Sequence, residues 1–243
     1  VTRRCPAFEE GLYLTEVEIK GTISDTRVQP VTGECVTPLS IEQSAYKALV
    51  LGVKDYVDKN GFKGVVIGLS GGIDSALTLA VAVDALGKDR VEAVSMPSRY
   101  TADMSIDDAR QEAETLGIEF RVISIEAVFK AFLESLKEEF AGTDTDTTEE
   151  NIQARCRGLL LMAISNKKRK IVLTTGNKSE MAGGYATLYG DMAGGFDGLK
   201  DLPKGLVDRL AEFPNGNSPF IPGRVVERPP SAKLSPDPTD QDR

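Results

Sequence analysis

The stretch Ser70-Gly71-Gly72-Ile73-Asp74-Ser75 decides the fold of this chain. It follows an apolar run at 65–69 that is typical of a buried strand, and it precedes residues 76–86, which are typical of a helix. A glycine-rich turn between a strand and a helix presents backbone N–H groups to a phosphate, and the helix dipole favours the same negative charge. We therefore predict a phosphate-binding loop over 70–75.

Two simpler interpretations fit this stretch less well. The loop that grips the terminal phosphates of nucleotides has the pattern G-x-x-x-x-G-K-[ST], and no lysine follows the glycines here. An ordinary Gly-Gly turn that caps the next helix needs only one serine or aspartate. This stretch combines two glycines, two serines and Asp74, which favours a phosphate site.

Asp74 points to a metal ion. A carboxylate repels a phosphate, so its presence in a phosphate loop indicates Mg²⁺ that bridges it to a bound triphosphate. The structural alternative is a carboxylate that only stabilises the first turn of a helix, an effect below about 1 kcal/mol.

Short apolar runs alternate with amphipathic segments along most of the chain. Together they predict an α/β fold, a doubly wound parallel sheet with helices on both faces. Ligands bind such sheets outside the carboxyl ends of the strands, at a topological switch point. We expect strands near 64–69, 91–95, 120–124 and 170–175, and helices near 40–61, 74–86, 104–117, 126–140 and 149–167.

The two ends of the chain differ from this pattern. We expect 1–38 to be a linker or the tail of a preceding domain, with a strand near 13–19 and a polar linker from Thr22 to Pro38. Residues 39–243 form the main domain. Within it, glycine-rich 176–204 is interpreted as a mobile active-site segment, and proline-rich 214–243 as irregular. Because the chain begins at Val1, we expect a fragment or a processed chain.

Composition excludes several classes of protein. The formal net charge is −8, which argues against a nucleic-acid partner. The one basic run, 167–170, is interpreted as a solvated helix end. No apolar run approaches the roughly 20 residues that cross a membrane, so we expect no membrane partner. Three separated cysteines without a C-x-x-C pair predict reduced thiols in the cytoplasm.

The chain contains no histidine, which removes Ser-His-Asp and Cys-His catalysis. Any chemistry therefore falls to carboxylates, Lys, Arg, backbone N–H groups and metal. Glu180, after the last predicted strand, is a candidate second Mg²⁺ ligand, and Lys178 or Lys204 can neutralise charge on a departing pyrophosphate. Arg99 is equally well explained as a phosphate contact or as a surface residue.

Asn151 and Arg155 are four residues apart on a predicted helix and share one face. An amide beside a guanidinium can hold a carboxylate or a phosphate. The alternative is a plain surface pair.

Two longer motifs resemble the NAD synthetases. The loop over 70–75 is similar to that of the N-type ATP pyrophosphatases in general, which share the adenine nucleotide alpha hydrolase-like fold. The segments 175–180, 184–191 and 150–157 are much narrower matches. The likeness runs from about Ser40 to near the end. Residues 1–38, with Cys5 to Glu10, resemble the exit of the glutaminase domain that precedes the synthetase in longer members.

The resemblance implies ATP-dependent amidation. The nicotinate carboxylate of deamido-NAD would attack the α-phosphorus of ATP, giving an adenylate and pyrophosphate, and ammonia would then displace AMP to leave NAD. The nitrogen donor would be free ammonia or glutamine-derived ammonia. Family members are homodimers, or higher oligomers where a glutaminase domain is present.

The resemblance also implies roles for individual residues. Asp74, Glu180 and Lys204 would be catalytic, and the first two would hold Mg²⁺. The nucleotide contacts would be Ser70, Gly71, Gly72, Asp74, Ser75, Thr175, Lys204 and Ser231 for ATP, and Asn151, Arg155, Tyr185 and Asp191 for deamido-NAD. The sequence departs from the family at Gly183, Gly198, Gly205 and Asp208, and the family chain usually continues past Arg243, so we expect 39–243 to be C-terminally incomplete.

Two other functions stay open on sequence alone. Another ATP-pyrophosphatase amidotransferase, such as a GMP-synthetase-like enzyme, would share the loop but should lack the segment 177–180. A non-catalytic nucleotide-binding module would not need both Asp74 and Glu180.

Overall fold

The computed structural model describes residues 1–22, 25–213 and 221–227. It divides into two compact units, Val1–Ala48 and Leu49–Arg243. Helix α1 (Ile41–Lys59) begins in the first unit and ends in the second. Its start is the predicted capping box, because the Ser40 N–H donates to Gln43 Oε1 at 3.0 Å and the Gln43 N–H donates to Ser40 Oγ at 3.1 Å.

The first unit contains an antiparallel hairpin of β1 (Val17–Thr22) and β2 (Asp25–Pro30). Val17 lies opposite Pro30 and Ile19 opposite Val28, so one face of the hairpin is apolar. The prediction of a linker over Thr22–Pro38 is therefore wrong for β2. Its sequence is rich in turn-forming and charged residues, and pairing with β1 makes it a strand.

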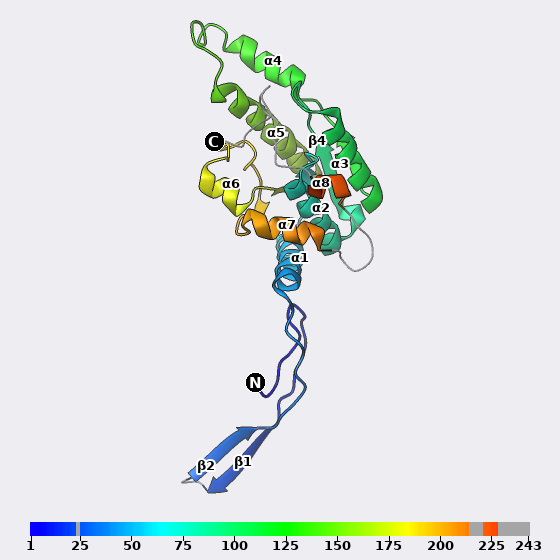
Figure 1. Ribbon diagram of the computed structural model, residues 1–243, viewed down its shortest axis with the longest axis vertical. Coiled ribbons are helices and arrows are strands. Elements are labelled where there is room, and N and C mark those ends of the chain that lie inside the picture. The colour runs from blue at the N-terminus through cyan, green and yellow to red at the C-terminus, as the bar shows by residue number, and fades with distance from the viewer. Residues whose placement is uncertain (23–24, 214–220, 228–243) are drawn as a thin grey trace. The chain divides into compact units, whose positions relative to one another are not determined.

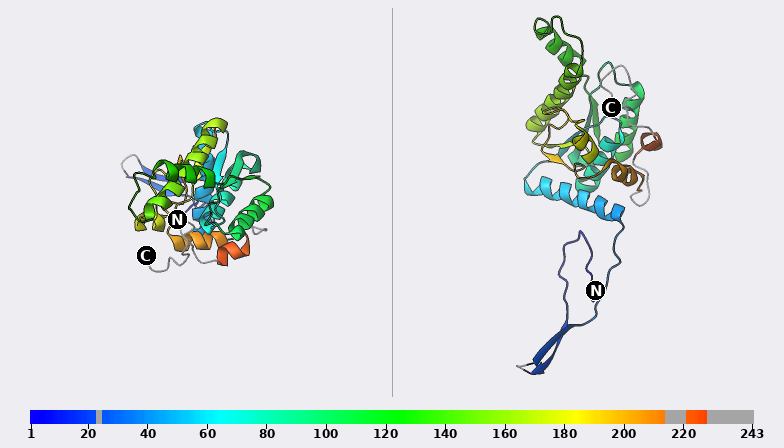
Figure 2. Two further views of the ribbon diagram at one scale, coloured as in Figure 1. Left: turned by 90° about the horizontal axis from the view of Figure 1, so that it is seen from above. Right: turned by 60° about the vertical axis from the view of Figure 1, so that its left-hand side comes forward.

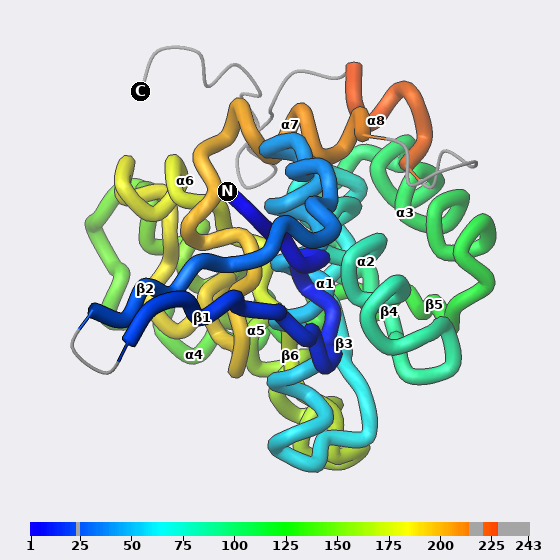
Figure 3. The backbone as a smooth tube through the Cα atoms, turned by 90° about the horizontal axis from the view of Figure 1, so that it is seen from below, coloured from blue at the N-terminus to red at the C-terminus, as the bar shows by residue number. Residues whose placement is uncertain are grey.

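The second unit is built on a parallel sheet, as predicted, with five strands where the sequence predicted four. Its strand order is β5-β4-β3-β6-β7, so the chain reverses direction across the sheet between β3 and β6. Figure 3 shows β6, β3, β4 and β5 in this order. The strands are β3 (Val65–Gly68), β4 (Val91–Ser95), β5 (Glu119–Val122), β6 (Ile171–Thr174) and β7 (Phe196–Asp197).

Helices follow the strands and cover the sheet. Because β-α-β crossovers are right-handed, α2 and α3 cover one face, and α4 and α5, which lie side by side, cover the other (Figures 1 and 2). A core cluster that includes Val66, Val94, Val172 and Phe129 fills the space beneath α4 and α5. The helices are α2 (Ile73–Leu86), α3 (Asp103–Leu116), α4 (Glu126–Ser135), α5 (Thr147–Lys168), α6 (Lys178–Gly183), α7 (Lys204–Glu212) and α8 (Gly223–Glu227), with a short 3₁₀ turn at Lys88–Arg90.

The glycine-rich segment 176–204 contributes to the sheet, which the sequence interpretation missed. It contains α6 and the edge strand β7. Gly194 and Gly195 let the chain approach β6, because a Cβ on Gly194 would lie 2.4 Å from Thr174 Cγ2 and one on Gly195 would lie 2.6 Å from Ile171 Cδ1. Of the segment 214–243, only 221–227, which contains α8, lies within the described residues.

The basic run 167–170 holds a buried carboxylate, so its interpretation as a solvated helix end is wrong for two of its lysines. Lys168 Nζ donates to both oxygens of Glu92, at 2.6 and 2.7 Å, and Lys170 Nζ donates to Oε2 at 3.2 Å. Glu92 is fully buried near the amino end of β4. Burial raises its pKa, but the two lysines outweigh that effect and leave the pKa below its usual value.

Among the described residues, no helix is both long enough and apolar enough to cross a membrane.

Candidate functional site

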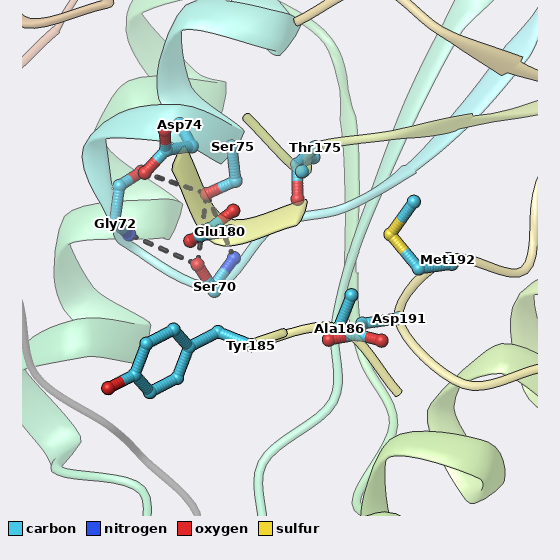
Figure 4. A pocket seen from close by; sticks show the side chains of 11 residues that line it. Ser70, Gly72, Asp74, Ser75, Thr175, Glu180, Tyr185, Ala186, Asp191 and Met192 are labelled. Atoms are coloured by element: carbon cyan, nitrogen blue, oxygen red, sulfur yellow. Dashed lines mark hydrogen bonds between the residues drawn. The ribbon is translucent and has the colours of Figure 1, made fainter. Parts of the chain in front are cut away.

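A cavity of about 140 Å³ lies beyond the carboxyl ends of β3 and β6, at the switch point of the sheet. It brings together residues from the loop after β3, the start of α6 and the segment between α6 and β7 (Figure 4). Its lining residues are Ser70, Gly72, Asp74, Ser75, Thr175, Gly176, Glu180, Tyr185, Ala186, Asp191 and Met192.

The loop between β3 and α2 is closed by its own hydroxyl groups. The Ser70 and Ser75 hydroxyls lie 3.0 Å apart, the Gly72 N–H donates to Ser70 Oγ at 3.2 Å, and Ser75 donates to the Gly72 carbonyl at 2.9 Å (Figure 4). Gly71 has a φ of +71°, and a Cβ there would lie 2.2 Å from the Ser105 carbonyl oxygen. Only glycine fits that position, and the N-terminus of α2 is left facing the cavity.

Asp74, on the first turn of α2, is held by two side chains from distant segments. Lys204 Nζ donates to Asp74 Oδ2 at 2.8 Å, and Asn177 Nδ2 donates to Asp74 Oδ1 at 2.9 Å. Lys204 also lies 3.6 Å from Asp208. The structure therefore brings Asp74 and Lys204, two residues that the sequence proposed for one site, into direct contact.

Asn177 is a site residue that the sequence interpretation did not single out. Its side chain is almost completely buried. Asn177 Oδ1 accepts the N–H groups of Ser179 and Glu180 at 2.9 and 3.0 Å, while the Asn177 N–H donates to Glu180 Oε2 at 3.0 Å. This capping box fixes the start of α6 and the direction of the Glu180 side chain. An Asn followed three residues later by Glu is the signal that reveals it in the sequence.

Glu180 faces Asp74 across the same cavity. Burial raises the pKa of Glu180; the Asn177 N–H lowers it, and the negative charge of Asp74 raises it again. A buried carboxylate that faces a second carboxylate is the kind of group whose charge a divalent cation neutralises.

The donor set fits Mg²⁺ rather than a closed metal centre. Within the described parts of the chain, no three Cys, Asp or Glu side chains come together as a potential metal site. Mg²⁺ usually takes one or two carboxylates and completes its shell with water and substrate phosphates. Asp74 and Glu180, beside the loop over 70–75, could supply such a partial shell.

The segment between α6 and β7 carries Asp191 and packs directly on α5. Asp191 Oδ1 accepts the Thr187 N–H at 2.7 Å, and burial raises the pKa of Asp191. A Cβ on Gly158 of α5 would lie 2.6 Å from the Gly190 carbonyl oxygen. Glycine at 158 therefore allows the segment to lie directly on the helix.

Asn151 and Arg155 contact this segment rather than the cavity. Asn151 Oδ1 accepts the Thr187 hydroxyl at 2.8 Å, and Arg155 Nε donates to the Leu188 carbonyl at 3.3 Å. The two residues do share a face of α5, as their spacing predicts. In the structure, that face supports the segment that bears Tyr185 and Asp191.

Arg157 is a second residue that the sequence interpretation passed over. Burial lowers the pKa of its guanidinium, and the nearby charge of Asp191 raises it. Arg157 Nε donates to the Met96 carbonyl at 3.1 Å. Arg157 lies four residues after Gln153, which the structure shows to be buried, so both lie on the buried face of α5.

Of the remaining predicted residues, some line the cavity and others do not. Thr175 lines the cavity. Lys178 is exposed at the start of α6, and Arg99 forms an ion pair with Glu126 and lies over the Phe129 ring, which accounts for it as a structural residue. Ser231 lies outside the described residues.

Comparison with known proteins finds matches over most of the chain. A family model described as NAD synthase matches residues 45–243. The glutamine-dependent NAD(+) synthetase of Acinetobacter baylyi is 47% identical over 244 residues, which cover 100% of this chain and 44% of that protein. The chain spans less than half the length of the glutamine-dependent relatives that it matches.

Two solved structures show the same architecture. The glutamine-dependent NAD+ synthetase from Acinetobacter baumannii, in complex with adenosine diphosphate, superposes with a TM-score of 0.80 at 46% identity, covering 84% of this chain and 41% of that chain. NMN synthetase from Francisella tularensis gives a TM-score of 0.74 at 32% identity, covering 84% of this chain and 80% of that one.

Proposed function

The chain belongs to the NAD synthase family, and on that premise we propose that it converts deamido-NAD to NAD, using ATP and releasing AMP and pyrophosphate. The observation that carries the proposal is that one and the same cavity is lined by the loop over 70–75, Asp74 and Glu180. These carboxylates come from segments that are more than 100 residues apart in the sequence. The named relatives and the ADP-bound neighbour support a nucleotide at this site.

In the first step, the nicotinate carboxylate attacks the α-phosphorus of ATP and pyrophosphate leaves. The hydroxyls of Ser70 and Ser75 and the N-terminus of α2 would bind the phosphates of ATP, with Gly71 and Gly72 allowing their close approach. Lys204 would balance charge on the leaving pyrophosphate. Mg²⁺, held by Asp74 and Glu180, would supply further charge neutralisation when bound.

In the second step, ammonia attacks the activated carbonyl carbon and AMP leaves. Adenylation gives the carboxylate a good leaving group, so the reaction needs no nucleophilic side chain. This agrees with a sequence that contains no histidine. Tyr185 and Asp191 line the cavity and would hold the dinucleotide, supported by Asn151 and Arg155, with Arg157 as an additional positive charge behind Asp191.

The names of the relatives suggest the source of nitrogen. We propose that ammonia is supplied free or from glutamine, by a glutaminase domain of which 1–38 is the tail, as in proteins named glutamine-dependent. We further propose a homodimer in the cytoplasm, where the free thiols of Cys5, Cys35 and Cys156 stay reduced.

The test is an assay of products with separate nitrogen donors. The chain is incubated with ATP, Mg²⁺ and deamido-NAD, and ammonium chloride or glutamine is then added. We expect NAD and AMP in equal amounts with ammonium. Parallel reactions with GMP-forming substrates, and with nicotinate mononucleotide because one neighbour is an NMN synthetase, define specificity. Amidation of one of those substrates, with none of deamido-NAD, would overturn the proposal.

A further inference from the structure

The first turns of α6 and α7 lie side by side and are joined by two hydrogen bonds (Figure 1). The Lys178 N–H donates to the Leu202 carbonyl oxygen at 2.9 Å, and the Lys204 N–H donates to the Ser179 hydroxyl at 3.1 Å. Because the two bonds run in opposite directions between the helix starts, they fix α6 and α7 in register with each other.

The Ser179 hydroxyl supplies a cap that α7 does not have of its own. The N-cap residue of α7 is Pro203, and it makes no side-chain hydrogen bond to the helix. The first N–H groups of a helix have no partner within that helix, and a serine oxygen is among the best acceptors for them. Helix α7 therefore takes this cap from α6, at Lys204, the residue whose ammonium group contacts Asp74.

Both helix starts also reach the Asp74 carboxylate. Lys204 Nζ, from α7, donates to Oδ2 at 2.8 Å, and Asn177 Nδ2, from the N-cap of α6, donates to Oδ1 at 2.9 Å. The Ser179 N–H donates to Asn177 Oδ1 at 2.9 Å, so these contacts close a ring of side chains and backbone groups. A lysine has a flexible four-carbon stem. The place of its ammonium group therefore depends on where its backbone is held.

We propose that Ser179 is a positioning residue for the reaction, and that its hydroxyl holds the Lys204 backbone so that the ammonium group stays beside Asp74. The inference rests on the proposed function, in which Lys204 balances charge on the leaving pyrophosphate. Ser179 is not among the described residues that line the cavity, so it acts through Lys204. The effect of a charge falls with its distance, and a misplacement of about 1 Å can cost much of the rate.

The competing explanation is that the Ser179 hydroxyl only stabilises α7. Loss of a helix cap would then lower the free energy of unfolding and leave the turnover of each folded molecule unchanged. An effect on the rate of the step that releases pyrophosphate, without an effect on the binding of deamido-NAD, distinguishes positioning from stability.

Ser179→Ala tests the positioning role in the exchange of labelled pyrophosphate into ATP, which reports the first step alone. We expect the maximal rate of exchange to fall roughly three- to tenfold, because one hydrogen bond between uncharged groups is lost. The KM for deamido-NAD should stay unchanged. Ser179→Thr keeps the hydroxyl and should restore most of the rate.

A hydroxyl far from the cavity supplies the matched control. Ser135 is exposed, and its hydroxyl donates to the Ala131 carbonyl within α4, so Ser135→Ala should exchange pyrophosphate at the wild-type rate. A wild-type rate in Ser179→Ala would overturn the proposal, and so would a rate in Ser179→Thr as low as that in Ser179→Ala.

Hydrogen exchange of the Lys204 backbone N–H tests the contact without any turnover. Measured by NMR on the chain without substrates, this N–H should exchange about tenfold faster in Ser179→Ala than in the wild type, Ser179→Thr or Ser135→Ala. Equal exchange in the wild type and Ser179→Ala would show that the hydroxyl does not hold Lys204. If the wild type protected this N–H but exchanged no pyrophosphate, the proposed function would fail while the hold of Ser179 on Lys204 would stand.

Discussion

The Asn177 amide donates to Asp74 Oδ1 at 2.9 Å across 103 positions of sequence. The oxygen of the same amide caps α6 and so sets the position of Glu180. One buried side chain thus fixes both carboxylates that face the cavity. The site can therefore be disturbed through Asn177 without touching either acid.

Substitutions at Asn177 can separate its hydrogen bond to Asp74 from its role as the cap of α6. Serine caps a helix about as well as asparagine, but it is too short to reach Asp74. In Asn177→Ser we expect turnover to fall by about ten- to a hundredfold, because a hydrogen bond to a charged group contributes roughly 1.5–3 kcal/mol. Asn177→Ala should lose the cap as well and unfold more easily by about 1 kcal/mol than the serine variant in urea. Normal turnover in Asn177→Ser would show that Asp74 needs no help from this amide.

A substitution at Gly158 tests how the segment that carries Asp191 packs on α5. A Cβ at 158 would meet the Gly190 carbonyl oxygen at 2.6 Å, so Gly158→Ala must push the segment away from α5. We expect the KM for deamido-NAD to rise several-fold and the KM for ATP to change little. Gly205→Ala is the matched control: it lies in α7 with open space around it, and should stabilise the fold by up to about 1 kcal/mol. An equal rise in both KM values would contradict a local effect.

The sequence predicted the sheet and the loop because their signals are local. A run of buried residues in β3, the glycines at 71 and 72 and the apolar face of α2 lie within 22 consecutive residues, so periodicity and turn chemistry identify them together. Glu180 was proposed because it follows the last predicted strand, and Lys204 because the family resemblance implies a role for it.

The sequence did not reveal features that depend on distant partners. The strand β7 has two residues, and its existence depends on close packing of Gly194 and Gly195 against β6. The sequence alone does not show that Lys168 and Lys170 pair with the buried Glu92, because Glu92 lies 76 and 78 positions away from them. Asn151 and Arg155 were correctly placed on one face, but only the fold shows that this face meets 187–188.

Glu112, buried on α3, makes stability depend on pH. Burial raises the pKa of Glu112 to about 8 from its usual 4.5, and within the described residues its Oε1 has no hydrogen-bond partner. Between these values the unfolded chain has lost the proton and the folded chain has kept it. The folded state therefore loses about 1 kcal/mol of stability per pH unit as pH rises from 5 to 8.

Glutamine at position 112 should remove this dependence. We expect Glu112→Gln to gain stability over the wild type progressively from pH 5 to pH 8, measured as the free energy of unfolding in urea at each pH. Glu114→Gln, on the exposed side of the same helix, should leave the wild-type slope intact. Parallel curves for Glu112→Gln and the wild type would show that Glu112 is ionised in the folded protein.

The exchange of labelled pyrophosphate into ATP tests most directly whether Asp74 and Glu180 activate a carboxylate at the loop over 70–75. We predict exchange that requires both Mg²⁺ and deamido-NAD, that proceeds without ammonia, and that disappears in Asp74→Asn and Glu180→Gln while both variants stay folded by circular dichroism. Exchange without deamido-NAD, release of ADP in place of AMP, or wild-type exchange in either variant at limiting Mg²⁺ would contradict the account.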